Sequence, residues 1–228
     1  MQRRTLAIVA SAIVIILAAA IFIFARPQGT NATHQASGAA TVVGTPIPTT
    51  GLQKYSIVSG SSSASYSVHE NLIFGGVGSH TAVGNTEGVT GSFFLGSTGT
   101  VQLTQVDISV DLTGLQSDSS LRDGHVQDYL NTSQFPDAVF TSTNVEGLPA
   151  SYTSGETISF KIVGNLKLHG VTNKETFTVS GKLVGNQVTG TASTTIFMTD
   201  FGVTPPDLAN IAIVDNKVVL SINFIAQG

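Results

Sequence analysis

The alternation of apolar and polar residues along most of the chain predicts β-strands. In residues 103–112, for example, Val106, Ile108, Val110 and Leu112 fall on one face, and aspartate and serine fall on the other. Successive side chains of a strand point to opposite faces of a sheet, so this alternation indicates a strand with one buried face. The pattern recurs in about eight segments, which are residues 55–59, 64–70, 89–95, 103–112, 157–170, 174–184, 191–198 and 217–226.

Turn sequences between these segments favour antiparallel pairing. The clearest hairpin signals are residues 170–173 (GVTN) and Gly185 with Asn186. About eight antiparallel strands with one apolar face form either a barrel or a sandwich. An eight-stranded barrel has a lumen just wide enough to be filled by side chains or to hold one small ligand. Periodicity alone leaves a filled barrel, an open barrel and a sandwich as alternatives.

Residues 120–131 have a different pattern, which predicts a short helix. Ser120 and Asp123 have the spacing of a capping box, with aspartate in place of the usual glutamate or glutamine. Pro136 ends any helical continuation. The residues expected to share a broad apolar face are Leu121, Val126, Tyr129 and Leu130.

The N-terminal region predicts a membrane anchor. Residues 6–25 are an uncharged, almost wholly apolar run flanked by arginines, and about 20 such residues span a bilayer. A cleaved signal peptide is the alternative, with Ala18–Ala20 as its cleavage site. Residues 27–53 lack periodicity and are rich in Gly, Ala, Thr and Pro. We therefore expect a signal-anchor in residues 1–26, a flexible linker in 27–53 and a folded domain in 54–228. The domain is expected on the extracytoplasmic side of the cell membrane, or secreted if the anchor is cleaved.

Composition and charge narrow the classes of function. The chain has no cysteine, which excludes disulfides, thiolate metal sites and cysteine nucleophiles. Seven basic and fourteen acidic residues follow residue 26, so this part carries a net charge of −7. Arg122 is its only arginine. Such a surface cannot offer a continuous basic patch for phosphates, and we expect no nucleic-acid partner.

A set of short motifs occurs in order along the exported part of the chain. They are residues 65–69 (SYSVH), 89–93 (VTGSF), 122–125 (RDGH), 135–136 (FP), 139–142 (VFTS), 164–172 (GNLKLHGVT) and 200–202 (DFG). This ordered set, over about residues 55–226, resembles the YceI-like family, also called polyisoprenoid-binding or lipid-binding periplasmic proteins. The chain departs from the family pattern at residues 70–74 (ENLIF), in the glycine-rich residues 75–88 and in residues 205–210 (PPDLAN).

The resemblance implies an all-β fold, an eight-stranded antiparallel, lipocalin-like barrel with one short helix. It also implies an apolar lumen that holds an isoprenoid or similar long-chain lipid, with export and no catalytic activity. We expect no cofactor. From the residues alone, six phenylalanines could simply fill a dry core, whereas the resemblance implies that they line the lumen. They are Phe93, Phe135, Phe140, Phe160, Phe177 and Phe224.

The charged residues of the helical segment admit three interpretations. Arg122 could pair locally with an acidic residue and orient the helix. Alternatively, Arg122, Asp123 and His125, together with His169, could meet a lipid head group at the barrel mouth. Arginine suits a phosphate or quinone oxygen because its planar fork donates two hydrogen bonds. The third interpretation is a zinc site formed by Asp123 with histidines 69, 125 and 169, although no pair of histidines has a local ligand spacing. We expect no metal.

No enzyme motif supports a catalytic function. The chain has no G-x-S-x-G elbow, no P-loop and no dinucleotide glycine fingerprint. Taken with the resemblance to the YceI-like family, the sequence predicts a membrane-tethered, exported protein that carries or sequesters an isoprenoid lipid of the quinone or polyprenyl type. The alternatives are a non-binding structural or interaction module with a filled barrel, and a metal-dependent hydrolase.

Overall fold

The computed structural model describes residues 51–73, 78–96, 101–208 and 212–228. These residues all belong to one compact unit, Thr45–Gly228. The predicted membrane segment in residues 1–26, and the predicted linker up to residue 50, lie outside the described residues. Within the described ranges, no helix has the length and apolar character needed to cross a membrane.

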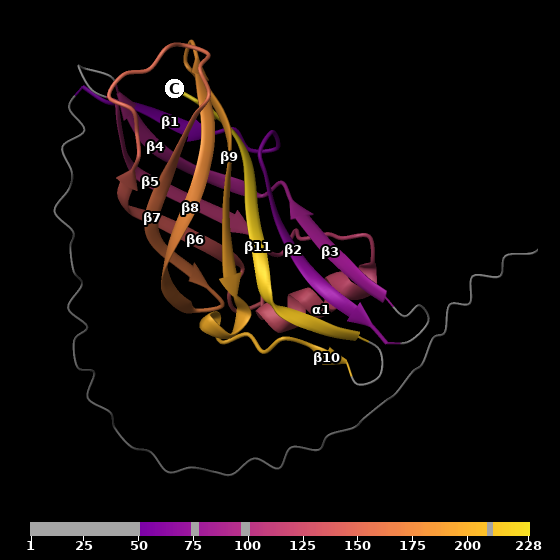
Figure 1. Ribbon diagram of the computed structural model, residues 1–228. Helices are drawn as coiled ribbons and strands as arrows, with labels where there is room; N and C mark the ends of the chain where they lie inside the picture. The colour runs from indigo at the N-terminus through magenta and orange to yellow at the C-terminus, as the bar shows by residue number, and fades with distance from the viewer. Residues whose placement is uncertain (1–50, 74–77, 97–100, 209–211) are drawn as a thin grey trace, which may run out of the picture. The chain divides into compact units, whose positions relative to one another are not determined.

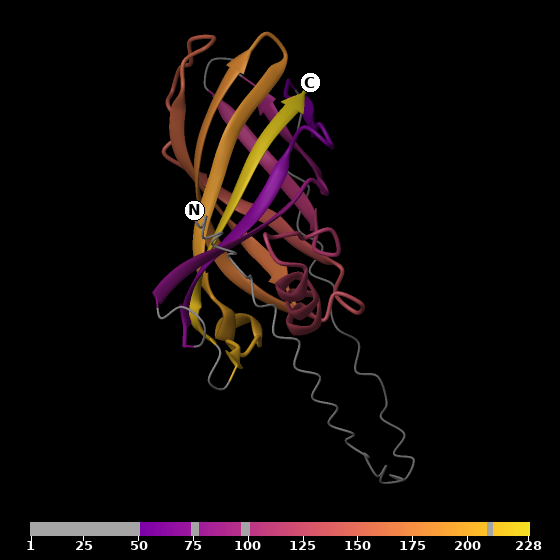
Figure 2. The same ribbon diagram turned by 90° about the vertical axis from the view of Figure 1, so that its right-hand side faces the viewer.

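Eight antiparallel strands form a closed barrel (Figures 1 and 2). In ring order the strands are β1 (Gln53–Ile57), β4 (Val89–Gly96), β5 (Gln102–Asp111), β6 (Asp137–Glu146), β7 (Ile158–Leu168), β8 (Val171–Val184), β9 (Gln187–Phe197) and β11 (Ala212–Gln227). The ring closes where Ser56 of β1 pairs with Gln227 of β11. The all-β, eight-stranded barrel with one short helix is thus confirmed. Because the ring and its core both come from Thr45–Gly228, this unit contains what it needs to fold by itself.

Three further strands extend the sheet outside the ring. β2 (Ser63–Leu72) follows β1 along the same edge of β11, and β3 (Gly78–Thr86) pairs with β2. The two-residue β10 (Asp207–Leu208) pairs with the start of β11. The predicted strand at residues 64–70 is therefore β2, which lies beside the ring, and the strand that completes the ring is β6.

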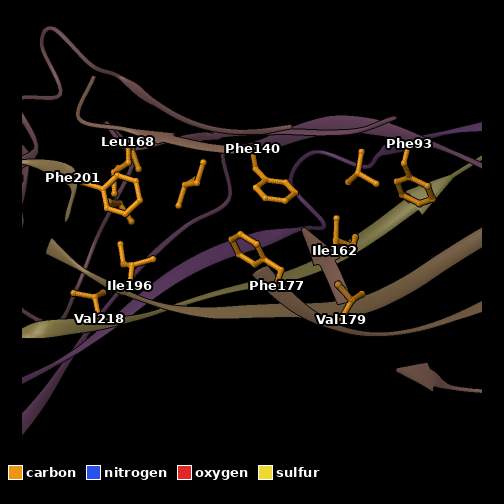
Figure 3. Packing of buried hydrophobic residues seen from close by; sticks show 14 of the residues in the cluster. Phe93, Phe140, Ile162, Leu168, Phe177, Val179, Ile196, Phe201 and Val218 are labelled. Atoms are coloured by element: carbon orange, nitrogen blue, oxygen red, sulfur yellow. The ribbon is translucent and has the colours of Figure 1, made fainter. Parts of the chain in front are cut away.

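One part of the barrel is filled by its own side chains. Phe201, from the short 3₁₀-helix η1 (Met198–Phe201), is completely buried and plugs the end of the barrel. Figure 3 shows Phe201 beside the inward-facing Leu168 of β7, Ile196 of β9 and Val218 of β11. The packing is that of a dry core.

The helix α1 (Ser120–Leu130) covers this same end of the barrel (Figures 1 and 2). Its N-cap is Ser119, whose hydroxyl accepts the backbone N–H of Arg122, so the cap lies one residue before the predicted Ser120. Gln127 donates from its side-chain amide to the backbone carbonyl of Leu112 at 2.9 Å and ties the helix to the barrel.

The apolar face predicted for the helix is only half correct. Val126 and Leu130 pack against the core, but the side chains of Leu121 and Tyr129 are exposed, Leu121 by 73%. No residue of α1 is fully buried, because the helix lies at the surface of the barrel end. Polar contacts supply the remaining attachment.

Candidate functional site

A cavity of about 520 Å³ opens at the end of the barrel away from α1. This volume lies within the range of about 300–1,000 Å³ that is common for small-molecule pockets. The residues that mark the opening are at the start of β1, the end of β4 and the hairpin between β8 and β9. They are Gly51, Gln53, Gly96, Lys182 and Gly185.

The wall of the cavity is almost entirely apolar and comes from most strands of the ring. Five of the six phenylalanines predicted to face the lumen do so. They are Phe93, Phe140, Phe160, Phe177 and Phe224. Aliphatic side chains such as those of Ile162 and Val179 fill the surface between the rings. The lining favours a hydrocarbon chain over a polar ligand.

Phe135 lies elsewhere. It follows α1 and precedes Pro136, so it belongs to the closed end of the barrel. Its ring meets His169 edge-on, with 5.4 Å between ring centroids. A Cβ atom at Gly170 would lie 2.8 Å from the same ring. Phe135 therefore covers the turn between β7 and β8 and does not line the cavity.

Two aromatic pairs shape the cavity. Phe140 and Phe177 meet edge-to-face, with centroids 4.9 Å apart and an interplanar angle of 69°, and both are buried. They close the inner end of the cavity toward the filled part of the barrel (Figure 3). Nearer the opening, Tyr55 and Phe93 stack at 5.5 Å. Burial raises the pKa of the Tyr55 hydroxyl above its ordinary value, so this phenol stays neutral to a higher pH than an exposed tyrosine.

Tyr152 fixes the loop between β6 and β7 at the opening. Its hydroxyl donates to the carbonyl of Leu183 at 2.6 Å and accepts the N–H groups of Leu183 and Gly155 at 2.7 and 3.0 Å. The polar tip is fully used, and the ring lines the cavity. Sequence reasoning missed Tyr152, Gln53 and Lys182. The available signal was that Tyr152 is the one aromatic residue in an aperiodic loop, residues 147–157.

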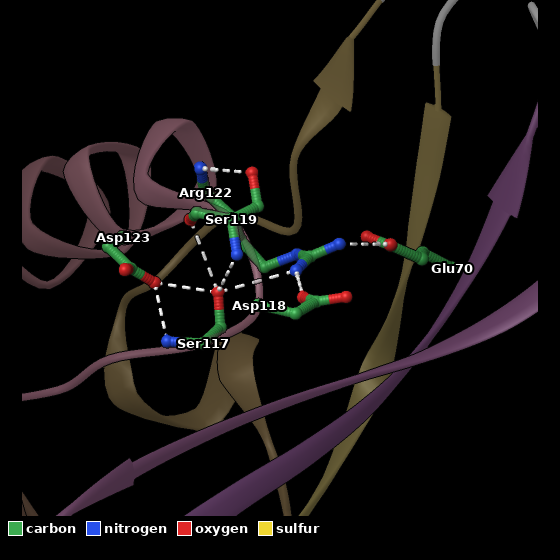
Figure 4. A network of polar contacts seen from close by, with 6 residues as sticks. All are labelled: Glu70, Ser117, Asp118, Ser119, Arg122 and Asp123. Carbon is green, nitrogen blue, oxygen red and sulfur yellow. Dashed lines mark hydrogen bonds and ion pairs between the residues drawn. The ribbon is translucent and has the colours of Figure 1, made fainter. Parts of the chain in front are cut away.

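The four residues predicted to meet a head group do not line this cavity. Arg122 donates to Glu70 Oε1 at 2.9 Å and to Asp118, and thereby joins α1 to β2 (Figure 4). Burial lowers the pKa of Arg122, but its bonds to Asp118 and Glu70 outweigh this effect and leave the pKa above its usual value. The hydrogen bond from Arg122 holds the pKa of the Asp118 carboxyl below its usual range. This is the local pairing that the first interpretation describes.

The other three residues predicted to meet a head group also lie away from the cavity. The Asp123 carboxylate accepts the backbone N–H and the hydroxyl of Ser117 at 2.8 and 2.6 Å (Figure 4). His125 is exposed on α1. His169 occupies a hairpin turn at φ 51°, and its Nδ1–H donates to the Phe201 carbonyl at 3.1 Å. A head-group role for these residues stays a prediction.

The histidines do not converge on a metal site. His69 is hydrogen-bonded to Thr81 and Ser79 on the outer face of β2 and β3. Across the part of the chain that the structure describes, no three His, Asp or Glu side chains are placed to hold a metal ion together.

Comparison with known sequences identifies a family and relatives that this chain resembles. The family profile described as the YceI-like domain matches residues 55–226. The chain is 37% identical over 109 residues to a UPF0312 protein of Pseudomonas putida, which covers 43% of this chain and 53% of that protein. It is 34% identical over 83 residues to the protein YceI of Escherichia coli, which covers 36% and 38% respectively. The chain thus spans about half, or less, of the length of these curated relatives.

Solved structures share the fold at low sequence identity. A polyisoprenoid binding domain from Saccharophagus degradans, implicated in plant cell wall breakdown, superposes with a TM-score of 0.57 at 16% identity, covering 76% of this chain and 98% of that one. BcnA of Burkholderia cenocepacia gives 0.58 at 16% identity, covering 75% and 99%. With the family profile matching from the first strand of the ring to the last, this chain belongs to the YceI-like family.

Proposed function

We propose that the barrel binds an isoprenoid or similar long-chain lipid, with the hydrocarbon tail inside the cavity and the polar end at the opening. The main observation in support is the apolar cavity. It is lined by five inward-facing phenylalanines, and the rest of the barrel is filled by side chains. The fold shared with the polyisoprenoid binding domain of Saccharophagus degradans supports the ligand class.

Physical chemistry favours this use of the cavity. Each methylene transferred from water to an apolar site contributes about 0.8 kcal/mol, so a lipid tail gains most of its affinity from burial alone. Among the described lining residues, Gln53 is a polar side chain at the opening that could face a head group, because it lies on the same face of β1 as the buried Tyr55. We therefore assign the cavity a carrying or sequestering role and no catalytic step.

Filling the cavity should abolish lipid binding. Ala192 lines the cavity on β9, and Ala192→Trp would occupy the space of a tail. We expect uptake of an apolar fluorescent probe, N-phenyl-1-naphthylamine, and its displacement by farnesol, to be lost in this variant of the unit Thr45–Gly228. The matched control is Thr191→Trp, because Thr191 is the neighbouring residue, is exposed and points to the outer face. A wild-type unit that takes up neither probe nor farnesol would favour the alternative, a structural module without a ligand.

We further propose that the domain is held at the extracytoplasmic face of the cell membrane by an anchor in residues 6–25. The uncharged, almost wholly apolar run of these residues and the arginines that flank it support the proposal. A quinone or a polyprenyl lipid of that membrane would then be available to the domain.

The anchor is testable by fractionation. The full chain should stay with the membrane pellet after alkaline carbonate washing, and the unit Thr45–Gly228 with an added export signal should be released. Release of the full chain would contradict the anchor and leave the lipid-binding proposal intact.

A further inference from the structure

We propose that Phe140 and Phe177 set how much of a lipid tail this barrel buries, and limit the buried part to about three isoprene units. This inference rests on the proposed function, since it specifies the ligand of the same cavity. It concerns how deep a tail can go, which the volume of the cavity alone does not decide.

The aromatic pair forms the floor of the cavity. Both rings line it, both side chains are 6% exposed, and they meet edge-to-face at 4.9 Å. Phe140 is also fixed from behind, because a Cβ atom at Gly164 of β7 would lie 2.5 Å from its ring. The Phe140 ring therefore cannot move toward β7 without displacing that strand.

The barrel beyond the floor is occupied. Figure 3 shows the pair between two groups of side chains, with Phe93, Ile162 and Val179 on the cavity side. On the other side lie Leu168, Ile196, Phe201 and Val218, none of which lines the cavity. Phe201 and Ile196 are 0% and 4% exposed. A longer tail would have to displace close-packed core residues, which is costly.

The depth of the cavity follows from the strand that lines it. Phe177 and Leu183 both face the cavity and lie six residues apart on β8. At about 3.3 Å per residue and a typical tilt of about 40°, this separation is roughly 15 Å along the barrel axis. An isoprene unit adds four chain bonds, or about 5 Å when extended, at ordinary bond lengths. About three units therefore fit between the opening and the floor.

Affinity should consequently rise with tail length and then level off. Each isoprene unit that moves from water into the cavity should raise the binding affinity at least about tenfold. A fourth or later unit would remain at the opening, exposed to water, and add little.

A competition between prenols tests the limit. The unit Thr45–Gly228 is equilibrated with equal concentrations of geraniol, farnesol, geranylgeraniol and solanesol, which have two, three, four and nine isoprene units, and the occupancy of each is read by native mass spectrometry. We expect farnesol to exceed geraniol by at least about tenfold. Geranylgeraniol and solanesol should reach no higher occupancy than farnesol.

Removing the floor should move the plateau by one isoprene unit. Phe177→Ala deletes six ring carbons at the floor, close to the five carbons of an isoprene unit, so geranylgeraniol should then exceed farnesol in occupancy. Phe93→Ala is the matched control, because it deletes the same ring from the wall on the cavity side of the floor and should leave the plateau at farnesol.

The outcomes separate the two proposals. Binding of none of the four prenols by the wild-type unit would remove the proposed function itself. Occupancy that continues to rise through solanesol, or an equal shift in both variants, would leave lipid binding standing and overturn the length limit. If Phe177→Ala does not fold, the series of prenols with the wild-type unit still tests the length limit.

Discussion

Replacing Phe201 with alanine is expected to lower the free energy of unfolding by about 3–5 kcal/mol. Phe201 is completely buried and fills the closed end of the barrel, in the same cluster as Leu168 and Ile196. The substitution would leave a cavity that strands on a closed ring cannot collapse to fill. Because the chain has no tryptophan, urea denaturation of the unit Thr45–Gly228 should be followed by circular dichroism.

Phe197→Ala is the matched control for this prediction. Phe197 lies four residues earlier, at the end of β9, and its side chain is 48% exposed. We expect its loss to cost less than about 1 kcal/mol. Similar costs for the two variants would show that the closed end is not the packed core described above.

Replacing Arg122 with alanine should cost about 2–4 kcal/mol. The Glu70 side chain is only 10% exposed, and Arg122, at 22%, donates to it at 2.9 Å. Without the guanidinium, the nearly buried Glu70 side chain would lose its ion-pair partner, and α1 would lose its ion pair to β2. The cost of breaking such a pair exceeds the net contribution of forming it.

A second substitution tests whether the loss of stability comes from the unpaired carboxylate of Glu70. Glu70→Gln in the Arg122→Ala background should recover part of the lost stability, because the neutral amide needs no cation. A double variant as unstable as the single one would contradict this explanation.

Arg122→Ala should also bind farnesol and farnesyl diphosphate with unchanged relative affinity, since Arg122 does not line the cavity. A selective loss for the charged ligand would instead support the head-group role predicted for Arg122.

Strands with a sustained alternation were predictable. Three strands were missed: β10 has only two residues, and β3 and β6 lack a sustained alternation. β6 contains a bulge between Ser142 and Asn144, so its inward positions change from Phe140 and Ser142 to Val145. A period-two pattern cannot survive such a shift. The buried positions of β3 are Ala82, Gly84 and Thr86, which are too small or too polar to give a hydrophobic signal.

The candidate site was likewise only partly predictable from the sequence. Four of the phenylalanines that line the cavity lie on strands predicted from periodicity, and the fifth, Phe140, lies on the missed strand β6. Phe135 has no strand pattern around it, and only the position of α1 shows that it belongs to the closed end. The concentration of charge at Arg122 and Asp123 was conspicuous in the sequence, but the partners Glu70 and Ser117 are visible only in three dimensions. Which end of the barrel is open depends on packing and not on any local motif.

Organic extraction of the purified unit Thr45–Gly228, followed by mass spectrometry of the extract, tests most directly whether the cavity holds an isoprenoid. We expect a discrete extractable lipid with an isoprene-spaced tail, absent from the Ala192→Trp variant prepared in the same way. An extract without lipid, from a protein that also refuses added farnesol, would contradict it.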